Sequence, residues 1–348
     1  MIFTNDPNVA LNDLLNANRY SSVFVLVDEN TQKHCIPLIK RSLKDRVSHT
    51  FTVSAGENTK NIDTCIHIWQ DLNRLGADRH ALLINVGGGM INDLGGFVAS
   101  TYKRGMDFIN VPTSMLAMID ASIGGKNGIN LGGMKNQIGT IRQPREVIIN
   151  PGFLASLDRR NYLSGYAEAL KHGLIGDPGA YQKTLKFISP KIDDALFLEF
   201  LQDNIAIKER IVEIDPEEKG ERKQLNLGHT IGHALETLSH HKGKPLLHGE
   251  AVAWGIVAEL SLSEKLHGFP GAVLKAVSQL VCMHYVKPDI SEADYVQLID
   301  YMKQDKKNYG KNIHFALLQK PGECLLDETT DKSNIVESLE YVRSLCQS

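Results

Sequence analysis

Five of the 13 histidines in the chain lie within one stretch of 20 residues, from His229 to His248. His229 and His233 are four residues apart in LNLGHTIGHALE, so a helix over this segment places both imidazoles on one face. His248, in LLHGEAVAWG, begins another apolar helical pattern and could supply a third nitrogen. A histidine pair at this spacing can bind a metal ion, and a pair satisfied by hydrogen bonds is about as common. The residues alone leave both interpretations open.

A catalytic zinc site typically has three protein ligands and an open position, and one ligand is often a carboxylate. The acidic candidates are Glu168 in SGYAEALKHGLI, Glu236 and Glu250, and the pattern does not choose among them. The zinc-protease motif HExxH is excluded, because Thr230 stands where that motif has its glutamate. The simplest hypothesis from spacing alone makes His229 and His233 joint ligands.

Glycines are concentrated in the other half of the chain, where 12 of the 29 fall between Gly87 and Gly139. The segment VGGGMINDLGGF follows a strand-like run and precedes a helical pattern. Such a loop lets backbone N–H groups approach a phosphate at a helix N-terminus. It is neither GxGxxG nor a Walker A motif, and a turn needed only for tight packing is the alternative. Asp93 could contact a ribose or nicotinamide, or simply favour the first helical turn.

Two nearby segments carry charges among small and apolar residues. Asp120 and Lys126 lie in VPTSMLAMIDASIGGKNGIN, and Lys135 and Asn136 lie in GGMKNQIG. Each lysine taken singly is best explained as a solvated loop charge. Buried charges need partners or ligands, so their density beside paired glycines favours a ligand site.

The elements that must position these residues divide the 348-residue chain into two domains, since one core rarely serves so long a chain. Residues 1–155 alternate strand and helix patterns, which predicts a Rossmann-like α/β domain with a largely parallel sheet. We expect strands over 22–30, 81–89, 108–114 and 146–150, and a helix over 61–79. Residues 156–348 read as mainly helical, with helices over 251–268 and 272–285.

Composition excludes several classes of protein. The chain is 42% hydrophobic and 23% charged, which is typical of a globular protein. A net charge of −3 argues against nucleic-acid binding, and no apolar run approaches the roughly 18 residues of a membrane span. The five cysteines are scattered without a CxxC pair, and the first residues lack a signal-peptide pattern. We therefore expect a reduced, cytoplasmic protein without disulfides.

Taken in order, the segments GGGMINDLGGFVASTYKRG, VPTSMLAMIDASIGGKNGIN, KNQIG, GYAEALKHGLI, LNLGHTIGHALE, LHGE and MKQDKK resemble the 3-dehydroquinate synthase family. The resemblance extends from about Val23 to Gly322. It implies a Rossmann-like NAD-binding domain, a mainly helical metal-binding domain, Zn²⁺ (with Co²⁺ as a substitute) and a homodimer. It also implies a lyase of the shikimate pathway, which leads to chorismate and aromatic amino acids.

The reaction that this resemblance implies converts 3-deoxy-D-arabino-heptulosonate 7-phosphate to 3-dehydroquinate and phosphate. NAD takes a hydride transiently, phosphate is eliminated, the hydride returns, and an internal aldol step closes the ring. The partner is thus a small phosphorylated sugar acid, and neither a nucleic acid nor a membrane is expected.

The resemblance also assigns residues by matching positions. The implied metal ligands are Glu168, His229 and His248, which makes His233 a proton-handling residue instead of a ligand. The implied NAD contacts are Asp28, Glu57, Lys60, Gly88, Gly89, Met90, Asp93, Thr113, Ser114, Lys135, Phe153 and Ser156. The implied substrate and acid–base residues are His233, Glu218, Lys126, Asn136, Arg104, Asp120, Lys171, Lys208, Arg222, Asn226 and Lys306 or Lys307.

The chain departs from the family pattern at a few positions. Asn127 stands where threonine is usual, Asn92 replaces a common glycine, and residues 131–134 replace a histidine–proline–leucine–glycine approach to KN. Three alternatives remain: a sugar-phosphate cyclase making 2-deoxy-scyllo-inosose or epi-valiolone, a metal-dependent alcohol dehydrogenase, and a non-catalytic nucleotide- or metal-binding regulator.

Overall fold

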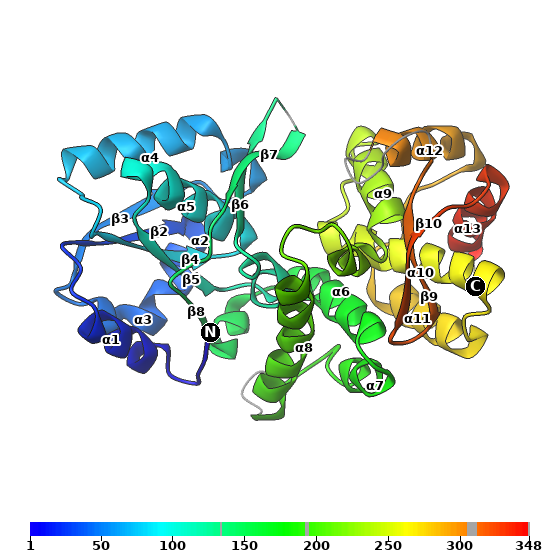
Figure 1. Ribbon diagram of the computed structural model, residues 1–348, viewed down its shortest axis with the longest axis horizontal. Coiled ribbons are helices and arrows are strands. Elements are labelled where there is room, and N and C mark those ends of the chain that lie inside the picture. Colours follow the sequence, from blue (N-terminus) through cyan, green and yellow to red (C-terminus); the bar gives the residue numbers. More distant parts are fainter. Residues whose placement is uncertain (133, 192–194, 305–311, 347–348) are drawn as a thin grey trace. The chain divides into compact units, whose positions relative to one another are not determined.

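The protein is described here by a computed structural model that covers residues 1–132, 134–191, 195–304 and 312–346 (Figure 1). The chain divides into two compact units. The first comprises Met1–Asp158 and Lys191–Gln202, and the second comprises Arg159–Pro190 and Asp203–Ser348. The expected boundary lay at residue 155, and no sequence pattern indicated that residues 195–202 group with the first unit.

The first unit is built on a six-stranded sheet whose neighbouring strands all pair in parallel. In spatial order the strands are β1 (Ile2–Phe3), β8 (Glu146–Ile149), β5 (Asp107–Pro112), β4 (Leu82–Gly87), β2 (Val23–Asp28) and β3 (Val47–Val53). Strands β2 and β4 are almost wholly buried and nearly all apolar, as expected where helices cover both faces. The four predicted strands are thus confirmed, whereas β1 and β3 were missed.

The strand order reverses between β2 and β4. From β2 the chain adds β3 on one side, and it then returns to add β4, β5 and β8 in succession on the other. In open parallel sheets, ligands bind beyond the carboxyl ends of the strands at such a reversal. The sequence places Asp28 directly at the end of β2 and the glycine-rich loop directly after β4.

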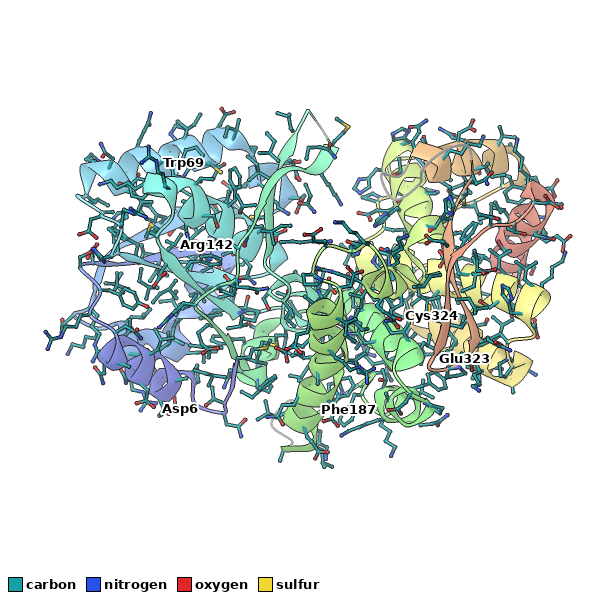
Figure 2. The ribbon with its side chains drawn as sticks, in the orientation of Figure 1. Asp6, Trp69, Arg142, Phe187, Glu323 and Cys324 are labelled. Atoms are coloured by element: carbon teal, nitrogen blue, oxygen red, sulfur yellow. A yellow bond between two sulfur atoms is a disulfide. The ribbon has the colours of Figure 1, made fainter. Side chains whose placement is uncertain are left out.

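Helices pack against this sheet, and apolar side chains of helices and strands together form the core of the unit. They are α1 (Pro7–Ala17), α2 (Glu29–His34), α3 (Ile36–Leu43), α4 (Ile62–Arg74) and α5 (Gly89–Thr101). Asn61 caps α4 by accepting the Thr64 N–H at 3.0 Å. Trp69 on α4 (Figure 2) packs against the core and donates its indole N–H to the Val98 carbonyl of α5 at 3.2 Å. The two helices are thereby fixed against each other above the sheet.

Short elements after the strands carry eight of the candidate ligand residues. They are the 3₁₀ segments η1 (Glu57–Thr59), η2 (Tyr102–Arg104) and η4 (Pro151–Ser156), the π-helical turn η3 (Ala117–Ala121), and an antiparallel hairpin of β6 (Lys126–Leu131) and β7 (Met134–Ile141). The hairpin packs against α5, which begins at the glycine-rich loop. The sequence patterns did not reveal it.

The second unit is mainly helical, as predicted. Its elements are α6 (Arg159–Ile175), α7 (Pro178–Leu185), residues 203–214 of α8 (Ala195–Ile214), η5 (Glu221–Asn226), α9 (His229–His241), α10 (His248–His267), α11 (Gly271–His284), η6 (Glu292–Asp294), α12 (Tyr295–Gln304), β9 (Phe315–Lys320), β10 (Glu323–Glu328) and α13 (Lys332–Ser344). Helix α10 contacts α6, α9, α11, α13 and β9, and it is buried along most of its length. The antiparallel pair β9–β10 was not anticipated.

The expectation of a chain without disulfides was wrong. Cys282 of α11 and Cys346, just beyond α13, form a disulfide, while Cys35, Cys65 and Cys324 are free. The two half-cystines are 64 residues apart, and only the fold brings α11 beside the end of α13. Cysteine spacing therefore carried no signal for this pair. Among the described residues, no helix is both long enough and apolar enough to span a membrane.

The disulfide should contribute measurably to stability. A cross-link across so long a loop restricts the unfolded chain and typically contributes about 2–4 kcal/mol. Cys282→Ser should therefore lower the Tm by about 5 °C or more, as read by calorimetry. Cys324→Ala, at a free cysteine of the same unit, should change it little. Alkylation of both Cys282 and Cys346 without prior reduction would contradict the pairing.

Candidate active site

Three helices of the second unit are brought together by glycines. Helices α9 and α10 run in opposite directions, with Gly228 facing Ile256 and Gly232 facing Ala251. A Cβ atom at Gly255 would lie only 1.9 Å from the Gly228 carbonyl oxygen, so the two backbones are in direct contact. The start of α10 meets α6 in the same way, because a Cβ at Gly249 would lie 1.8 Å from the Ser164 carbonyl oxygen.

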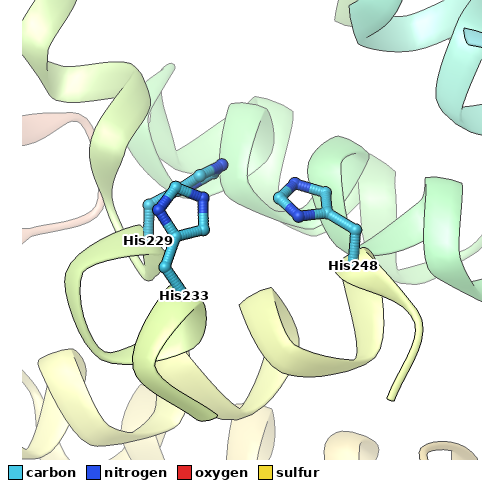
Figure 3. A group of neighbouring side chains, drawn as sticks. All are labelled: His229, His233 and His248. Carbon is cyan, nitrogen blue, oxygen red and sulfur yellow. The ribbon is translucent and has the colours of Figure 1, made fainter. Parts of the chain in front are cut away.

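These contacts bring three histidines into one cluster. His229 and His233 lie on the first turns of α9, and His248 is the first residue of α10. Figure 3 shows the three side chains around a common space, with the ring centroids 5.3–5.8 Å apart. One ring nitrogen from each lies within 4.8 Å of the others. The expected helical pairing of His229 and His233 and the approach of His248 are both present.

Glu168 on α6 completes the cluster. Its carboxylate is fully buried, and Oε1 lies 3.4 Å from Nε2 of both His229 and His248. Lys171, one turn along α6, forms an ion pair with the same carboxylate. Two imidazole nitrogens and one carboxylate oxygen therefore converge on a single point, which is the donor set that a divalent transition metal prefers.

The far nitrogens of both imidazoles are held by acceptors. Nδ1 of His229 lies 3.1 Å from the Leu227 carbonyl, and Nδ1 of His248 lies 3.1 Å from Oε2 of Glu236. A carbonyl and a carboxylate only accept, so each Nδ1 carries the hydrogen. Nε2 is therefore the nitrogen of each ring that faces Glu168 and is available to an ion, an arrangement common around metal-binding histidines.

The three carboxylates that the sequence left open have different places. Only Glu168 lies beside Nε2 of both histidines. Glu236 contacts the opposite side of the His248 ring. Glu250 is engaged by Arg160 through two hydrogen bonds of 2.7 Å and also accepts the Leu247 N–H.

Charge governs the protonation of this cluster. Burial raises the pKa of Glu168, but Lys171 and His229 outweigh burial and hold that pKa well below its ordinary value. Burial lowers the pKa of His248, whereas Glu168 and Glu236 raise it to about 10. The cluster therefore contains one carboxylate that stays ionised and one imidazole that is strongly stabilised as a cation. A bound metal cation would take the place of the proton on that imidazole.

The second unit also holds several cations of the predicted substrate set. Lys171, Lys208 and Arg222 are all at least 95% buried. Arg222 donates to the Pro216 carbonyl at 2.8 Å, and Asn226 donates to Glu218 at 3.1 Å. Buried cations suit a site for an anionic ligand. Lys306 and Lys307 lie outside the described residues.

In the first unit, the predicted NAD contacts follow the carboxyl ends of five strands. Asp28 ends β2, and Glu57 and Lys60 follow β3. Gly88, Gly89, Met90 and Asp93 follow β4 on the start of α5, Thr113 and Ser114 follow β5, and Phe153 and Ser156 follow β8. Lys135 lies apart from these, exposed on β7. The sheet thus collects at one edge residues that are up to 128 positions apart in the sequence.

Lys60 connects several of these segments. It is 97% buried and donates to Asp93 of α5 at 2.5 Å and to Asn136 of β7 at 2.6 Å. The Lys60 carbonyl accepts the Asn130 N–H at 2.8 Å. Burial raises the pKa of Asp93 to about 6 even though Lys60 opposes the shift. One lysine thus ties the loop after β3, helix α5 and the hairpin together.

The glycine-rich loop combines packing and access. A Cβ at Gly87 would clash with Ile91, and one at Gly95 would lie 1.9 Å from Asn85 Oδ1, so these glycines are required for packing. A Cβ at Gly88 would meet Ser114 Oγ only at 3.4 Å, an ordinary contact. Gly88 is the N-cap of α5, where backbone N–H groups favour an anion.

The structure explains one of the departures from the family pattern, Asn127. The Asn127 amide donates to the carbonyls of Gly125 and Arg142, both at 2.9 Å, and its oxygen packs against Gly96. Asn127 therefore fastens the hairpin to α5. Asn92 is buried on α5, and Leu131 and Met134 are exposed on the hairpin.

Backbone strain marks three of the predicted substrate residues. Among the described residues, seven non-glycine positions have positive φ angles, and they include Arg104 (68°), Asn136 (52°) and Glu218 (62°). Such conformations persist where the surroundings enforce them, and they are concentrated at functional sites. Two further predicted substrate residues lie between Arg104 and Asn136 in the sequence: Asp120 on η3 and Lys126 at the start of β6.

Comparison with known proteins decides the family. The model of the 3-dehydroquinate synthase N-terminal domain matches residues 50–164, and that of the C-terminal domain matches residues 165–308. A 3-dehydroquinate synthase from Parabacteroides distasonis is 42% identical over 343 residues, which is 99% of this chain and 97% of that protein. The chain belongs to the 3-dehydroquinate synthase family. A family member from Pyrococcus furiosus is 37% identical over 335 residues, 96% of each chain.

Solved structures share the fold of this family member. The 2-epi-5-epi-valiolone synthase of Streptomyces hygroscopicus, with NAD⁺ and Zn²⁺ bound, has a TM-score of 0.85 at 24% identity and covers 97% of this chain and 94% of that one. A 2-deoxy-scyllo-inosose synthase complexed with carbaglucose-6-phosphate, NAD⁺ and Co²⁺ has a TM-score of 0.80 at 23% identity, over 92% and 91% of the two chains. At these identities the likeness concerns the fold.

One buried carboxylate near the site was missed by the sequence analysis. Glu259 of α10 is fully buried and accepts the N–H groups of Gly228 at 2.5 Å and Ile231 at 3.1 Å. Gly228, the N-cap of α9, has no side-chain acceptor, and Glu259 supplies one from the neighbouring helix. An acid within the apolar run AWGIVAELSL was the available signal.

The glycine contact between α9 and α10 should be essential to the histidine cluster. Gly255→Ala forces the Gly228 carbonyl away from α10 and separates His229 from His248. We expect the Tm to fall by several degrees, because overpacking typically costs about 1–3 kcal/mol, and bound metal measured by atomic absorption to fall with it. Gly179→Ala in α7 is the matched control, because its added Cβ would meet only the Asp177 side chain and no backbone atom. Full metal content in Gly255→Ala would contradict this account.

Proposed function

We propose that the chain converts 3-deoxy-D-arabino-heptulosonate 7-phosphate to 3-dehydroquinate and phosphate, as a lyase that requires NAD and a divalent metal ion. The observation that supports this proposal is the convergence of Glu168, His229 and His248 in a chain that is 42% identical to a 3-dehydroquinate synthase over nearly its full length. The position of this reaction in aromatic amino-acid synthesis, a cytoplasmic location and a homodimeric state are part of the proposal, and they rest on the family resemblance.

Zn²⁺, or Co²⁺ in its place, would be held by Glu168 and by Nε2 of His229 and His248. The donor set fits because the carboxylate is ionised and both Nδ1 atoms are already occupied by acceptors. When bound, such an ion polarises a substrate hydroxyl and lowers its proton affinity. The ion pair between Lys171 and Glu168 keeps this carboxylate in its charged form.

His233 is the remaining imidazole of the cluster, and we assign it to proton transfer. It stands one turn beyond His229 on the same face of α9, so it lies beside the proposed metal without being needed as a ligand. A neutral imidazole exchanges protons near neutral pH. Glu218, held by Asn226 in a strained backbone conformation, is the second proposed acid–base group.

NAD is assigned to the carboxyl edge of the parallel sheet. The N-terminus of α5 offers backbone N–H groups to the pyrophosphate. Asp28 stands beside it at the end of β2, where an acidic residue commonly binds a ribose. The other proposed contacts are Glu57, Lys60, Gly88, Gly89, Met90, Asp93, Thr113, Ser114, Lys135, Phe153 and Ser156.

The substrate carries a carboxylate and a phosphate, and the proposed binding residues are mostly cationic. The buried cations Lys171, Lys208 and Arg222 would bind anionic groups through charge-assisted hydrogen bonds. Arg104, Asp120, Lys126, Asn136 and Asn226, with Lys306 or Lys307, complete the proposed set. These assignments rest on matched positions and on the burial and strain described above.

Related chemistries remain as alternatives. The solved cyclases share this fold, and so does an iron-containing alcohol dehydrogenase from Corynebacterium glutamicum, with a TM-score of 0.67 at 14% identity over 98% and 93% of the two chains. Identities of 34–42% to 3-dehydroquinate synthases, over 92–99% of this chain, favour the proposed substrate.

The reaction itself distinguishes these alternatives. With the heptulosonate phosphate, the purified enzyme should release phosphate and form dehydroquinate without net accumulation of NADH, because the hydride returns to the product. Chelator or removal of NAD should abolish phosphate release. Accumulation of NADH would indicate a dehydrogenase, and absence of dehydroquinate would refute the proposed activity.

Two variants distinguish the proposed metal ligands from a ligand set formed by His229, His233 and His248. Glu168→Gln removes the charged ligand, so zinc content and turnover should both fall by at least tenfold. His233→Asn should retain full zinc content and lose turnover by about 100-fold or more, as expected when an acid–base group is removed. Zinc content is measured by mass spectrometry and turnover by phosphate release. Full zinc in Glu168→Gln, or its loss in His233→Asn, would assign the ligands differently.

A further inference from the structure

We propose that Glu236 is a positioning residue that fixes the orientation and tautomer of His248 and thereby sets the metal affinity of the site. This inference rests on the proposed metal function and concerns a residue outside the ligand and acid–base sets. Glu236 lies on α9, seven residues after His229 and three after His233, so the three side chains share one face of the helix.

The geometry of the His248 ring carries the proposal. Oε2 of Glu236 accepts from Nδ1 at 3.1 Å, while Nε2 on the opposite side of the ring lies 3.4 Å from Glu168. Glu236 therefore cannot share an ion bound at Nε2. It can only act through the imidazole, by holding the hydrogen on Nδ1 and directing the Nε2 lone pair toward the ion.

The orientation of His248 depends on a side-chain contact, whereas that of His229 is fixed by a backbone contact. His229 follows a glycine N-cap in a tightly packed turn, and its Nδ1 is held by the backbone carbonyl of Leu227 two residues away. The His248 side chain is 30% exposed and begins a helix, and its Nδ1 atom is held by a side chain from α9. The Glu236 side chain is 11% exposed, so its carboxylate is largely shielded and its hydrogen bond little screened by water.

Glu236 places a carboxylate at a largely buried position of α9. Its neighbours Leu235 and Leu238 turn into the apolar core, as expected for α9. A carboxylate in this position costs desolvation free energy that a leucine would not. The contact with His248 gives this carboxylate a role in the cluster, because an anionic acceptor increases the basicity of the ligand nitrogen.

The test compares metal affinity in Glu236→Gln and Glu236→Leu, measured by competition with a chromophoric chelator. Outer hydrogen-bond partners of this type typically change affinity by about 10–100-fold. Leucine removes charge and acceptor, so we expect the Kd for Zn²⁺ to rise by about that factor. Glutamine keeps an acceptor oxygen and should restore part of the affinity. The absorption bands of the Co²⁺-loaded protein should change in the same order.

Glu250→Gln is the matched control, because Glu250 is a buried carboxylate two residues from His248 that is paired with Arg160. It should lower the Tm without a comparable change in metal affinity. Metal-free Tm values of the Glu236 variants report any purely structural effect. If Glu236→Leu fails to fold, Glu236→Gln alone carries the test through its Kd and cobalt spectrum.

The outcomes separate this inference from the proposed function. Wild-type Kd and cobalt spectrum in both Glu236 variants would overturn the positioning role while leaving the enzyme assignment intact. A loss of affinity in the Glu236 variants no greater than that of Glu250→Gln at a similar fall in Tm would also overturn it. Absence of metal binding by the wild-type protein would instead refute the metal part of the proposed function.

Discussion

Direct contact between helix backbones is the constraint on which the histidine cluster depends. Gly255 allows α10 to touch the Gly228 carbonyl of α9, and Gly249 allows α10 to touch α6. Glu259 then binds two N–H groups at the start of α9, which anchors the turn that carries His229. None of these residues is a proposed ligand, yet each determines where a ligand stands.

In the first unit, the order of the parallel strands brings the predicted ligand residues together, and glycine contacts between helices do not. Parallel strands deliver Asp28, the glycine-rich loop and Thr113 to one edge of the sheet, and Lys60 joins the loops there. Local order thus comes from a single buried cation with several acceptors. The whole-chain charge of −3 gives no indication of such local concentrations of charge.

Sequence patterns predicted what depends on local periodicity. The apolar runs of β2, β4, β5 and β8, the helix after Asn61, and the common helix of His229 and His233 all follow from short-range spacing. Glu168 could not be chosen over Glu236 by spacing, because the choice depends on how α6, α9 and α10 cross. The Cys282–Cys346 pair and the β6–β7 and β9–β10 hairpins depend in the same way on contacts or turns that composition does not encode.

The facing arrangement of α9 and α10 has a consequence for how these segments can change in length. Seven residues separate His229 from Glu236, close to two helical turns, and eleven separate His248 from Glu259, close to three. Each helix therefore presents its histidine and its carboxylate on nearly the same side. Inserting or deleting one residue within either interval would rotate one group by about 100° relative to the other. These two intervals must keep their length even where their residues are free to vary.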